Sequence, residues 1–273
     1  MHTNIDTHRI VSICEDTLET PNVKTLIFQD NLSFKAKPGQ FLMVWIPGVE
    51  ELPMSVMVSN TNDNAAITVK KYGIGSTALF QKKKGDVIGI RGPYGNYFRV
   101  SKKQKKVILI GGGTGLVPLM RLSVILNKMQ ISCTLIIGAR SKPEILFYNF
   151  AKKILQNTKH KIIVTTEDGS FGIKGYPTDA LIKILEHDKF DMAYTCGPEL
   201  MMKKVYDISI SYDLSLQASL ERYMKCGVGI CASCCINDKL VCTDGTVFNN
   251  KELKMMTDFG LIYRNKSGIK SHY

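Results

Sequence analysis

Residues 226–242 read CGVGICASCCINDKLVC, and this cysteine-rich stretch carries the clearest chemical signal in the chain. Cys226, Cys231 and Cys234 are separated as C-x4-C-x2-C, and Cys242 supplies a fourth thiol within the same short segment. This order is the spacing of plant-type iron–sulfur sites. Two glycines between the first two cysteines fit that use, because residues without a Cβ let the backbone wrap closely around a cluster. The pattern therefore favours an iron–sulfur centre.

Other uses of these cysteines stay open at this point. A four-cysteine zinc site also tolerates short spacings, although zinc ribbons usually pair two C-x2-C knuckles and only one is present. Disulfides are less favoured, because no secretory signal precedes the chain. Cys235 is surplus: adjacent side chains point in different directions, so only one of Cys234 and Cys235 is expected to be a ligand. We take Cys234, which keeps the iron–sulfur spacing.

The composition is that of an ordinary globular protein of two or three domains, with 273 residues, 44% of them hydrophobic and 22% charged. No apolar run is long enough to span a bilayer and the N-terminus has no signal-peptide pattern, so a cytoplasmic protein without membrane contact is expected. The net charge is +12, but the lysines are dispersed apart from runs at 82–84 and 101–106, and no nucleic-acid motif accompanies them. Nucleic acid is therefore not an expected partner. Cys14 and Cys133 lie in apolar strand-like runs and are expected to be buried thiols.

Residues 9–100 read as short strands rich in β-branched and aromatic residues, separated by Pro, Gly and Asn turns. Regularly spaced short strands without a long helix predict a small antiparallel barrel. One helical piece, at about 76–83, follows Gly73 and Gly75. Its glycine-flanked N-terminus could hold a phosphate through free backbone amides. A helix that merely closes the barrel is the alternative.

After the polar run at 101–106, the pattern changes to apolar strands alternating with helices, which predicts a parallel sheet covered on both faces. Strands are expected near 106–110, 133–140, 161–169 and 191–199. The first is followed by GGGTG at 111–115 and a helix, an arrangement that suits a dinucleotide pyrophosphate. The motif lacks the third glycine and the later acidic residue of the full fingerprint, so a glycine-rich turn without a ligand is the alternative. Glu167 and Asp168 lie at the end of another predicted strand. They are expected either to contact a ribose or to form a solvated loop.

A nicotinamide delivers two electrons as a hydride, whereas a simple iron–sulfur cluster takes one at a time. A flavin exchanges electrons both singly and in pairs, so the combination predicts a flavin in the barrel. The best sequence candidates are residues 53–56, where Ser55 could hydrogen-bond the reactive edge of the ring, and residues 73–77, where Gly75 and Ser76 could receive the diphosphate. In the alternative reading, Ser55 is a strand hydroxyl satisfied by a neighbouring backbone group.

The motifs GGGTGLVPL, LIIGARSKPEILF, TEDGSFGIKGYPTDAL, TCGPELMMKKV and ERYMKCGVGICASCC occur in this order over most of the chain. Together they resemble the ferredoxin-reductase superfamily and, within it, the electron-transfer subunits of dihydroorotate dehydrogenase. The resemblance implies an antiparallel FAD-binding β-barrel at 1–101, a parallel-sheet NAD-binding α/β domain at 102–217, and a small 2Fe-2S domain with a C-terminal tail at 218–273. The tail is expected to be frayed or to become ordered on a partner.

The resemblance also assigns site residues. Carried over by position, Ser55 and the turn at Gly75 and Ser76 are implied FAD contacts. The further residues expected to bind FAD are Pro53, Met54, Val56, Lys70, Gly73 and Thr77. The implied nicotinamide contacts are Gly113, Thr114, Gly115, Cys196, Gly197 and Pro198. The implied cluster ligands are Cys226, Cys231, Cys234 and Cys242. Ser55 and Cys196 are the expected catalytic residues, with Cys196 positioning the nicotinamide rather than acting as a nucleophile, because no His or Asp partner is evident.

One position departs from the family pattern. Members often have Arg-Pro-x-Ser, whose arginine binds the flavin diphosphate, but Leu52 occupies that place here. Leucine cannot replace a bidentate phosphate ligand. Phosphate contacts are then expected from backbone amides near Gly75 or from Lys70 or Lys71.

The resemblance predicts an oxidoreductase subunit of pyrimidine biosynthesis. Electrons from dihydroorotate would leave the FMN of a separate catalytic subunit and pass through the 2Fe-2S cluster and FAD to NAD+, in an assembly of two plus two subunits. Alternatives within the superfamily are a γ-type subunit of a soluble hydrogenase or a ferredoxin–NADP reductase. The alternative of another class is a zinc-stabilised, redox-sensing binding protein.

Overall fold

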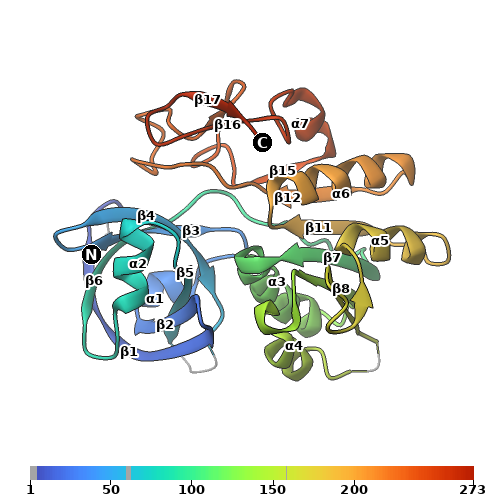
Figure 1. Ribbon diagram of the computed structural model, residues 1–273, viewed down its shortest axis with the longest axis horizontal. Helices are drawn as coiled ribbons and strands as arrows, with labels where there is room; N and C mark the ends of the chain where they lie inside the picture. Colours follow the sequence, from blue (N-terminus) through green and yellow to red (C-terminus); the bar gives the residue numbers. More distant parts are fainter. Residues whose placement is uncertain (1–4, 60–62, 158) are drawn as a thin grey trace.

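The computed structural model describes residues 5–59, 63–157 and 159–273. A barrel formed by the N-terminal part of the chain lies beside a sheet flanked by helices, and the C-terminal segment lies across both (Figure 1). Within the described ranges, no helix is long and apolar enough to cross a membrane.

The N-terminal body is a closed antiparallel barrel with the strand order β1-β2-β5-β4-β3-β6, as expected. Its strands are β1 (Arg9–Thr20), β2 (Val23–Gln29), β3 (Phe41–Ile46), β4 (Glu50–Met57), β5 (Asn64–Lys70) and β6 (Val87–Tyr94). Two helices accompany them, α1 (Asn31–Phe34) and α2 (Ile74–Gln81), the latter starting two residues earlier than expected. Along β1 every second side chain faces the core, so Ile13 is buried while Cys14 is exposed. The expectation of a buried Cys14 is therefore wrong.

The second body is a seven-stranded sheet with the order β10-β9-β8-β7-β11-β12-β15. Its strands are β7 (Lys106–Gly112), β8 (Ser132–Ala139), β9 (Lys161–Thr166), β10 (Ile173–Lys174), β11 (Met192–Cys196), β12 (Leu216–Ser219) and β15 (Val247–Asn249). Its helices are α3 (Leu116–Lys128), α4 (Tyr148–Ile154), α5 (Pro177–Leu185) and α6 (Glu199–Ser211), with 3-10 turns η1 (Gly113–Gly115) and η2 (Lys142–Glu144). All strand pairs are parallel except β12–β15. The predicted parallel sheet is confirmed, and Cys133 is buried in it as expected.

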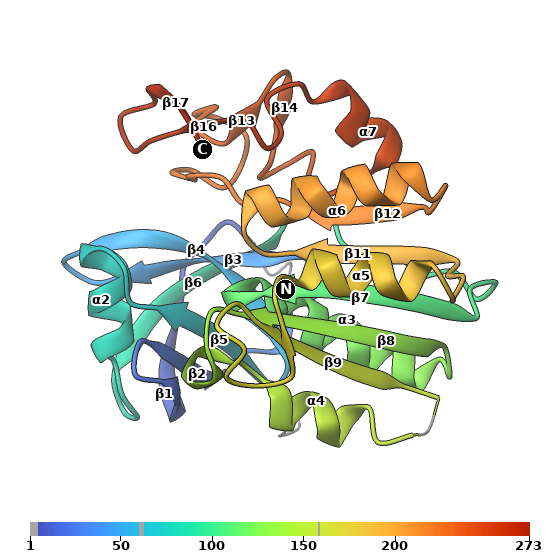
Figure 2. The ribbon, with the colours of Figure 1, turned by 45° about the vertical axis from the view of Figure 1, so that its right-hand side comes forward.

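The two faces of this sheet carry separate apolar cores. Helices α3 and α4 pack on one face and α5 and α6 on the other (Figure 2). The apolar strands are covered on both sides because their right-handed crossovers place the helices alternately on the two faces. This arrangement brings the carboxyl ends of β7, β8, β9 and β11 to one edge, beside the barrel.

The C-terminal segment is folded onto the other two bodies. It contributes β15 to the sheet, followed by α7 (Asn250–Met255) and the hairpin of β16 (Ile262–Arg264) and β17 (Lys270–His272). The cysteine stretch carries the short pair β13 (Cys235–Ile236) and β14 (Lys239–Leu240). The expected boundary between residues 217 and 218 falls inside β12, whereas that at 101 and 102 lies in the turn before β7. Of the two expectations for the tail, fraying is wrong, because residues 262–272 form a hairpin, whereas contact with a partner subunit stays a prediction.

Arg121 of α3 ties the barrel to the sheet. Its guanidinium donates hydrogen bonds to the carbonyl oxygens of Ala36 (2.7 Å), Met57 (3.1 Å) and Phe34. Burial without a carboxylate partner lowers the pKa of Arg121 to about 10. Three barrel carbonyls thus depend on one side chain of the sheet domain, which holds the two bodies at a fixed spacing.

Candidate active site and cluster loop

Three adjoining cavities follow the carboxyl edge of the sheet. We call them the barrel cavity (about 230 Å³), the central cavity (about 450 Å³) and the outer cavity (about 450 Å³). The barrel and central cavities share Lys70, Thr114, Glu221 and Arg222 in their walls, and the central and outer cavities share Lys70, Gly112, Gly113 and Pro198. The three therefore form one groove, at the edge where open α/β sheets bind ligands.

The barrel cavity is lined by four of the predicted flavin residues, Pro53, Met54, Ser55 and Lys70. Within the part of the chain that the structure describes, the Ser55 hydroxyl makes no hydrogen bond, so it is free to bind a ligand. Val56 points the other way and is buried in the barrel core, as the two-residue period of β4 requires. The cavity therefore offers an apolar wall and one polar handle from β4, which suits a planar aromatic ring.

The expected diphosphate site lies at the first turn of α2, outside the three cavities. Ser76 accepts hydrogen bonds from the amides of Tyr72 (3.0 Å) and Gly73 (2.9 Å), so its hydroxyl is already used within the turn. A Cβ on Gly75 would overlap the carboxylate of Glu50, which is also paired with Lys266 (3.6 Å). The positive end of a helix favours an anion at this place, and here Glu50 supplies it. The Thr77 amide already donates to the Gly73 carbonyl (2.9 Å), so a diphosphate at this place would bind the first-turn amides of residues 74–76 and requires that Glu50 turn away.

Lys70, at the end of β5, lines all three cavities. Its ammonium group has no ion pair or hydrogen bond to any of the described residues. Lys71, by contrast, lies over the ring of Phe80, 5.4 Å from its centroid, and lines none of the three cavities. Of the two lysines considered as substitutes for an arginine at position 52, Lys70 has the suitable position.

The central cavity is built on the glycine-rich turn after β7 and the turn after β11. Five of the residues predicted to contact the nicotinamide line it: Gly113, Thr114, Gly115, Gly197 and Pro198. Gly115 packs so closely on Gly197 that a Cβ would lie 2.5 Å from the Gly197 nitrogen. Gly115, the fourth glycine of the GGGTG run, is therefore required by the close packing of the two turns.

Cys196 lies beneath the two glycine-containing turns and does not line the central cavity. It is buried, and burial together with the negative charge of Glu221 raises the pKa of its thiol well above the usual range. A thiol that stays protonated is a poor nucleophile. That Cys196 positions the nicotinamide rather than acting as a nucleophile stays a prediction.

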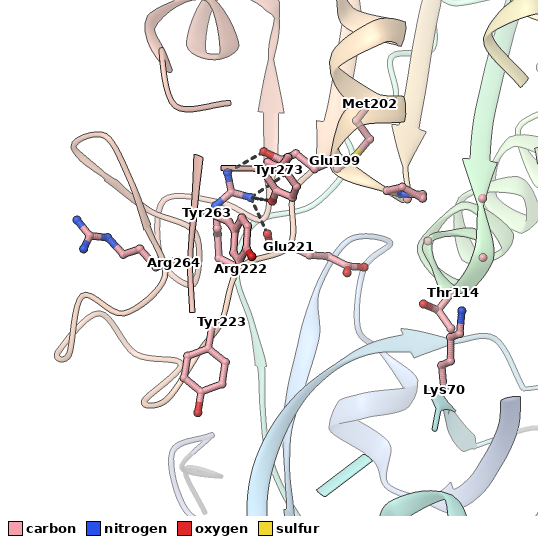
Figure 3. Close-up of a pocket in the computed structure, with 15 residues that line it drawn as sticks. Lys70, Thr114, Glu199, Met202, Glu221, Arg222, Tyr223, Tyr263, Arg264 and Tyr273 are labelled. Carbon is pink, nitrogen blue, oxygen red and sulfur yellow. Dashed lines mark hydrogen bonds and ion pairs between the residues drawn. The ribbon is translucent and has the colours of Figure 1, made fainter. Parts of the chain in front are cut away.

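The opposite wall of the central cavity holds charged residues that the sequence did not single out (Figure 3). The Arg222 guanidinium donates to both carboxylate oxygens of Glu199, at 2.8 and 2.7 Å, and this pair is buried. Glu221 reaches into the cavity. The adjacent Arg222 guanidinium is bound to Glu199 and therefore does not pair with Glu221. Glu221 is exposed to the groove, but the protein atoms that surround its carboxylate, and after them the negative charge of Glu199, raise its pKa.

Aromatic residues of the C-terminal hairpin complete this wall. Tyr263 and Tyr273 lie against each other with ring centroids 5.0 Å apart, and both line the central cavity together with Arg264. Tyr273 also lies beside Arg222, 3.4 Å from its Nη1. The segment expected to be a frayed tail thus covers the groove. Nothing in its local composition marks it as part of a site.

The thiols of the cysteine stretch are arranged as two pairs. Cys231 lies beside Cys226, and Cys242 beside Cys234. Backbone amides point at the sulfurs: those of Val228 and Cys231 at Cys226 Sγ (3.5 and 3.4 Å), and that of Cys242 at Cys234 Sγ (3.4 Å). Among the described residues, no three His, Cys, Asp or Glu side chains converge as one metal ion requires. Two pairs suit a two-iron cluster, in which each iron takes two thiolates.

The acidity of these thiols also fits a metal site. Burial, reinforced by the neighbouring Cys242, raises the pKa of Cys234 to about 12, so a bound cation is needed to hold it as a thiolate. For Cys231, burial is outweighed by hydrogen bonds from Ser233 and Cys226, and the pKa falls to about 6. Cys235 starts β13 and is partly exposed, whereas Cys234 is buried against Cys242. The geometry favours Cys234 as the ligand of this adjacent pair.

The cluster loop is fastened to the barrel. The Arg91 guanidinium of β6 donates to the carbonyl of Cys226 (2.6 Å) and makes two bonds to Glu51 of β4 (2.7 and 2.6 Å). Gly227 has a φ of +72° and lies directly on Met43, where a Cβ would be 2.7 Å from Met43 Cγ. The loop can approach β3 this closely only with glycine at 227.

Phe41 links the loop to the barrel cavity. Its ring lines that cavity and also reaches within contact distance of a Cβ position at Gly227 (3.8 Å). Met224, two residues before Cys226, lines the same cavity. A group bound in the barrel cavity and a cluster in the loop are therefore neighbours across one layer of side chains.

Comparison with known families agrees with this geometry. Residues 221–254, which include all four paired cysteines, match the model of the iron–sulfur cluster binding domain of dihydroorotate dehydrogenase B. Residues 109–207 match the oxidoreductase NAD-binding domain. A protein of Methanocaldococcus jannaschii named "Probable dihydroorotate dehydrogenase B (NAD(+)), electron transfer subunit" is 41% identical over 267 residues, 97% of each chain. One of Pyrococcus furiosus with the same name is 43% identical, over 95% of this chain and 97% of its own.

The chain belongs to the family of dihydroorotate dehydrogenase B electron transfer subunits. The predicted family and its oxidoreductase function are thereby confirmed. The solved structure of an NADH-dependent reduced ferredoxin–NADP oxidoreductase, a protein of flavin-based electron bifurcation, has a chain that is similar at a TM-score of 0.80 and 28% identity, over 92% of this chain and 94% of that one. A ferredoxin–NADP+ reductase of Neisseria gonorrhoeae, at 16% identity and a TM-score of 0.64 over 75% of this chain and 91% of that one, shares the fold. The three expected cofactors of this electron transfer subunit, a 2Fe-2S cluster, FAD and NAD, are confirmed with the family.

Proposed function

We propose that this subunit receives electrons from dihydroorotate, oxidised at the FMN of a separate catalytic subunit, and delivers them through its cluster and FAD to NAD+. The observation that supports this route is the position of Phe41, between the cluster loop and the barrel cavity. The groove then continues from the barrel cavity to the central cavity without a break. Sites for a cluster, a flavin and a nicotinamide thus follow one another in the order that electron transfer requires.

We propose that FAD binds with its ring in the barrel cavity. FAD, when bound, supplies the exchange between single-electron and two-electron transfer. The Ser55 hydroxyl donates to the ring edge, and Pro53 and Met54 form the apolar wall. Lys70 supplies the positive charge that Leu52 cannot, and the amides of residues 74–76 receive phosphate once Glu50, which is paired with Lys266, has turned away from them.

The nicotinamide end of NAD+ is placed in the central cavity, against Gly113–Gly115 and Gly197–Pro198. Formation of NADH from NAD+ and two electrons takes up one proton. Glu221 is in position to carry that proton, because it lines both the barrel and the central cavity and its raised pKa makes proton uptake easier than at an ordinary carboxylate. Arg222 is bound to Glu199, so its charge does not compensate that of Glu221. We assign Glu221 the role of proton carrier for the groove.

The cluster ligands proposed here are Cys226, Cys231, Cys234 and Cys242. Cys231 and its neighbour Ile230 are exposed, whereas Cys234 and Cys242 are buried. The exposed side of the loop is the side available to the FMN subunit, and the buried side faces the barrel. We further propose an assembly of two chains of each kind in the cytoplasm, with functional regions at 1–101, 102–217 and 218–273.

The test is to purify the chain with and without a dihydroorotate-oxidising FMN subunit and to record visible spectra and dihydroorotate-dependent NAD+ reduction. Flavin and iron–sulfur absorption, with activity in the joint preparation alone, supports the proposal. A coloured protein that oxidises NADH but never responds to dihydroorotate places the chain with another partner, such as a hydrogenase or ferredoxin. Colourless protein containing zinc rejects the electron-transfer route.

A further inference from the structure

The outer cavity extends the proposed NAD site away from the barrel. If the nicotinamide lies in the central cavity, the adenosine half of the dinucleotide reaches the outer cavity across Gly112 and Gly113, which line both. One buried group there points to a ligand. The hydroxyl of Thr178, in the first turn of α5, is buried and has no hydrogen-bond partner in the described structure, although the residue lines the cavity. Buried hydroxyls without partners are rare in folded proteins unless a ligand or water binds them.

The far wall of this cavity holds an exposed arginine that lies beside two carboxylates. Arg140 follows β8, and its Nε and Nη2 both donate to Glu144 Oε2, at 3.1 and 2.8 Å. Glu167, at the end of β9, faces the same guanidinium. The pKa of Arg140 is raised, mainly by Glu144 and to a smaller extent by Glu167. All three side chains line the outer cavity.

The other charged groups near this wall do not change the balance. Asp168 is turned away and accepts hydrogen bonds from the amide and hydroxyl of Ser170. Lys204 lines the cavity but is paired with Asp179 at 3.7 Å. Lys70 lies at the opposite end, where the three cavities meet. Around Arg140, the two carboxylates therefore exceed the one cation.

We propose that Glu144 and Glu167 make this site select NAD over NADP. The two coenzymes differ by a phosphate on the 2′-oxygen of the adenosine ribose. That phosphate carries nearly two negative charges, and Arg140 is the natural fork to bind it. Here the fork is already occupied by Glu144, and Glu167 adds repulsion, whereas a free ribose hydroxyl can donate a hydrogen bond to either carboxylate. Selectivity thus comes from the exclusion of the wrong ligand as well as from attraction of the right one.

This inference rests on the proposed NAD site and is tested by equilibrium binding, which does not depend on electron transfer. NAD+, NADP+, 5′-AMP and 2′,5′-ADP are titrated into the full chain by calorimetry. The variants are Glu144→Gln and Glu167→Gln, each alone and combined, and Glu144→Gln with Arg140→Gln. The matched control is Glu186→Gln, which removes one exposed carboxylate at the C-terminal end of α5, the end away from the cavity.

The native chain is expected to bind NAD+ more tightly than NADP+ by roughly tenfold or more. Each single variant raises affinity for NADP+ and 2′,5′-ADP by roughly threefold to tenfold, and the double variant raises it further. Removal of Arg140 abolishes the gain, and Glu186→Gln leaves the preference unchanged. Equal native affinities, an unchanged preference in both variants, or the same gain in Glu186→Gln would overturn the inference while leaving the NAD site in place. Failure of the native chain to bind any of the four nucleotides would overturn the proposed NAD site itself.

Discussion

The cluster loop and the nucleotide groove are built in opposite ways. The loop takes all its proposed ligands from residues 226–242 and is a local structure fastened to the barrel. The groove draws its walls from β4, β5, the turns after β7 and β11, and the C-terminal hairpin, which are far apart in the chain. A local site depends on its own residues, whereas a composite site depends on how the domains are held together. Substitutions should therefore damage one without the other.

The largest effect is expected from Cys234→Ser. A serine oxygen cannot replace the buried thiolate opposite Cys242, so the chain should lose nearly all of its iron and acid-labile sulfide and keep its flavin. Cys235→Ser is the matched control, because the adjacent thiol is not paired with Cys242, and it should retain the native iron content. Measurement of iron, sulfide and flavin per chain decides between them. Loss of the cluster from Cys235→Ser instead would reverse the ligand assignment.

Arg121→Met should damage the nucleotide groove and spare the cluster loop, the reverse of Cys234→Ser. The change leaves three carbonyls of the barrel interface without their donor and should lower the free energy of unfolding by about 2–4 kcal/mol. Flavin content should fall while iron is retained, since the groove crosses the domain boundary that Arg121 holds. Lys128→Met, on the exposed end of the same helix, should behave as native. If Arg121→Met keeps full flavin and native stability in denaturant titrations, the interface does not depend on this residue.

Lys70→Gln tests the groove without disturbing the fold. Loss of one charge-assisted contact should weaken FAD retention and NAD+ binding by roughly tenfold each and leave iron unchanged. Lys71→Gln removes the same charge from the neighbouring position, where the ammonium lies over Phe80, and should leave both affinities within about twofold. Flavin release on dilution and NAD+ titration supply the measurements. Equal losses in the two variants would show a general effect of charge rather than a contact at Lys70.

The smallest effect is expected from Glu221→Gln, in thermal unfolding measured against pH. The pKa of Glu221 is raised in the folded state, so folding favours the protonated carboxyl. The stability that this residue contributes is therefore fully present below its unfolded pKa of about 4.3. That stability is lost as the pH rises through the folded pKa. The variant should match the native melting temperature in acid and exceed it at neutral pH. Water in the cavity screens the charge, so the rise should be roughly 1–2 °C. A difference that grows toward acid pH would contradict the assigned shift.

The same contrast between local and composite sites explains what the sequence could predict. The cysteine spacing, the GGGTG turn and the strand–helix alternation are short-range patterns, and each predicted its part of the fold. Glu221 and the Glu199–Arg222 pair were missed, because their significance depends on the meeting of β11, β12 and the C-terminal hairpin. One local signal was available: ERY follows directly after β12, at the carboxyl edge of the sheet. Glu50 beside Gly75 could not be predicted, since it requires the register of β4 against α2.

The most direct test of the electron route is electron paramagnetic resonance of the joint preparation with the dihydroorotate-oxidising subunit, kept free of oxygen. Dihydroorotate without NAD+ should produce the signal of a reduced 2Fe-2S cluster, and added NAD+ should remove it as NADH forms. The Cys234→Ser preparation should give neither the signal nor NADH from dihydroorotate. Formation of NADH at the native rate by this cluster-free variant would contradict the account.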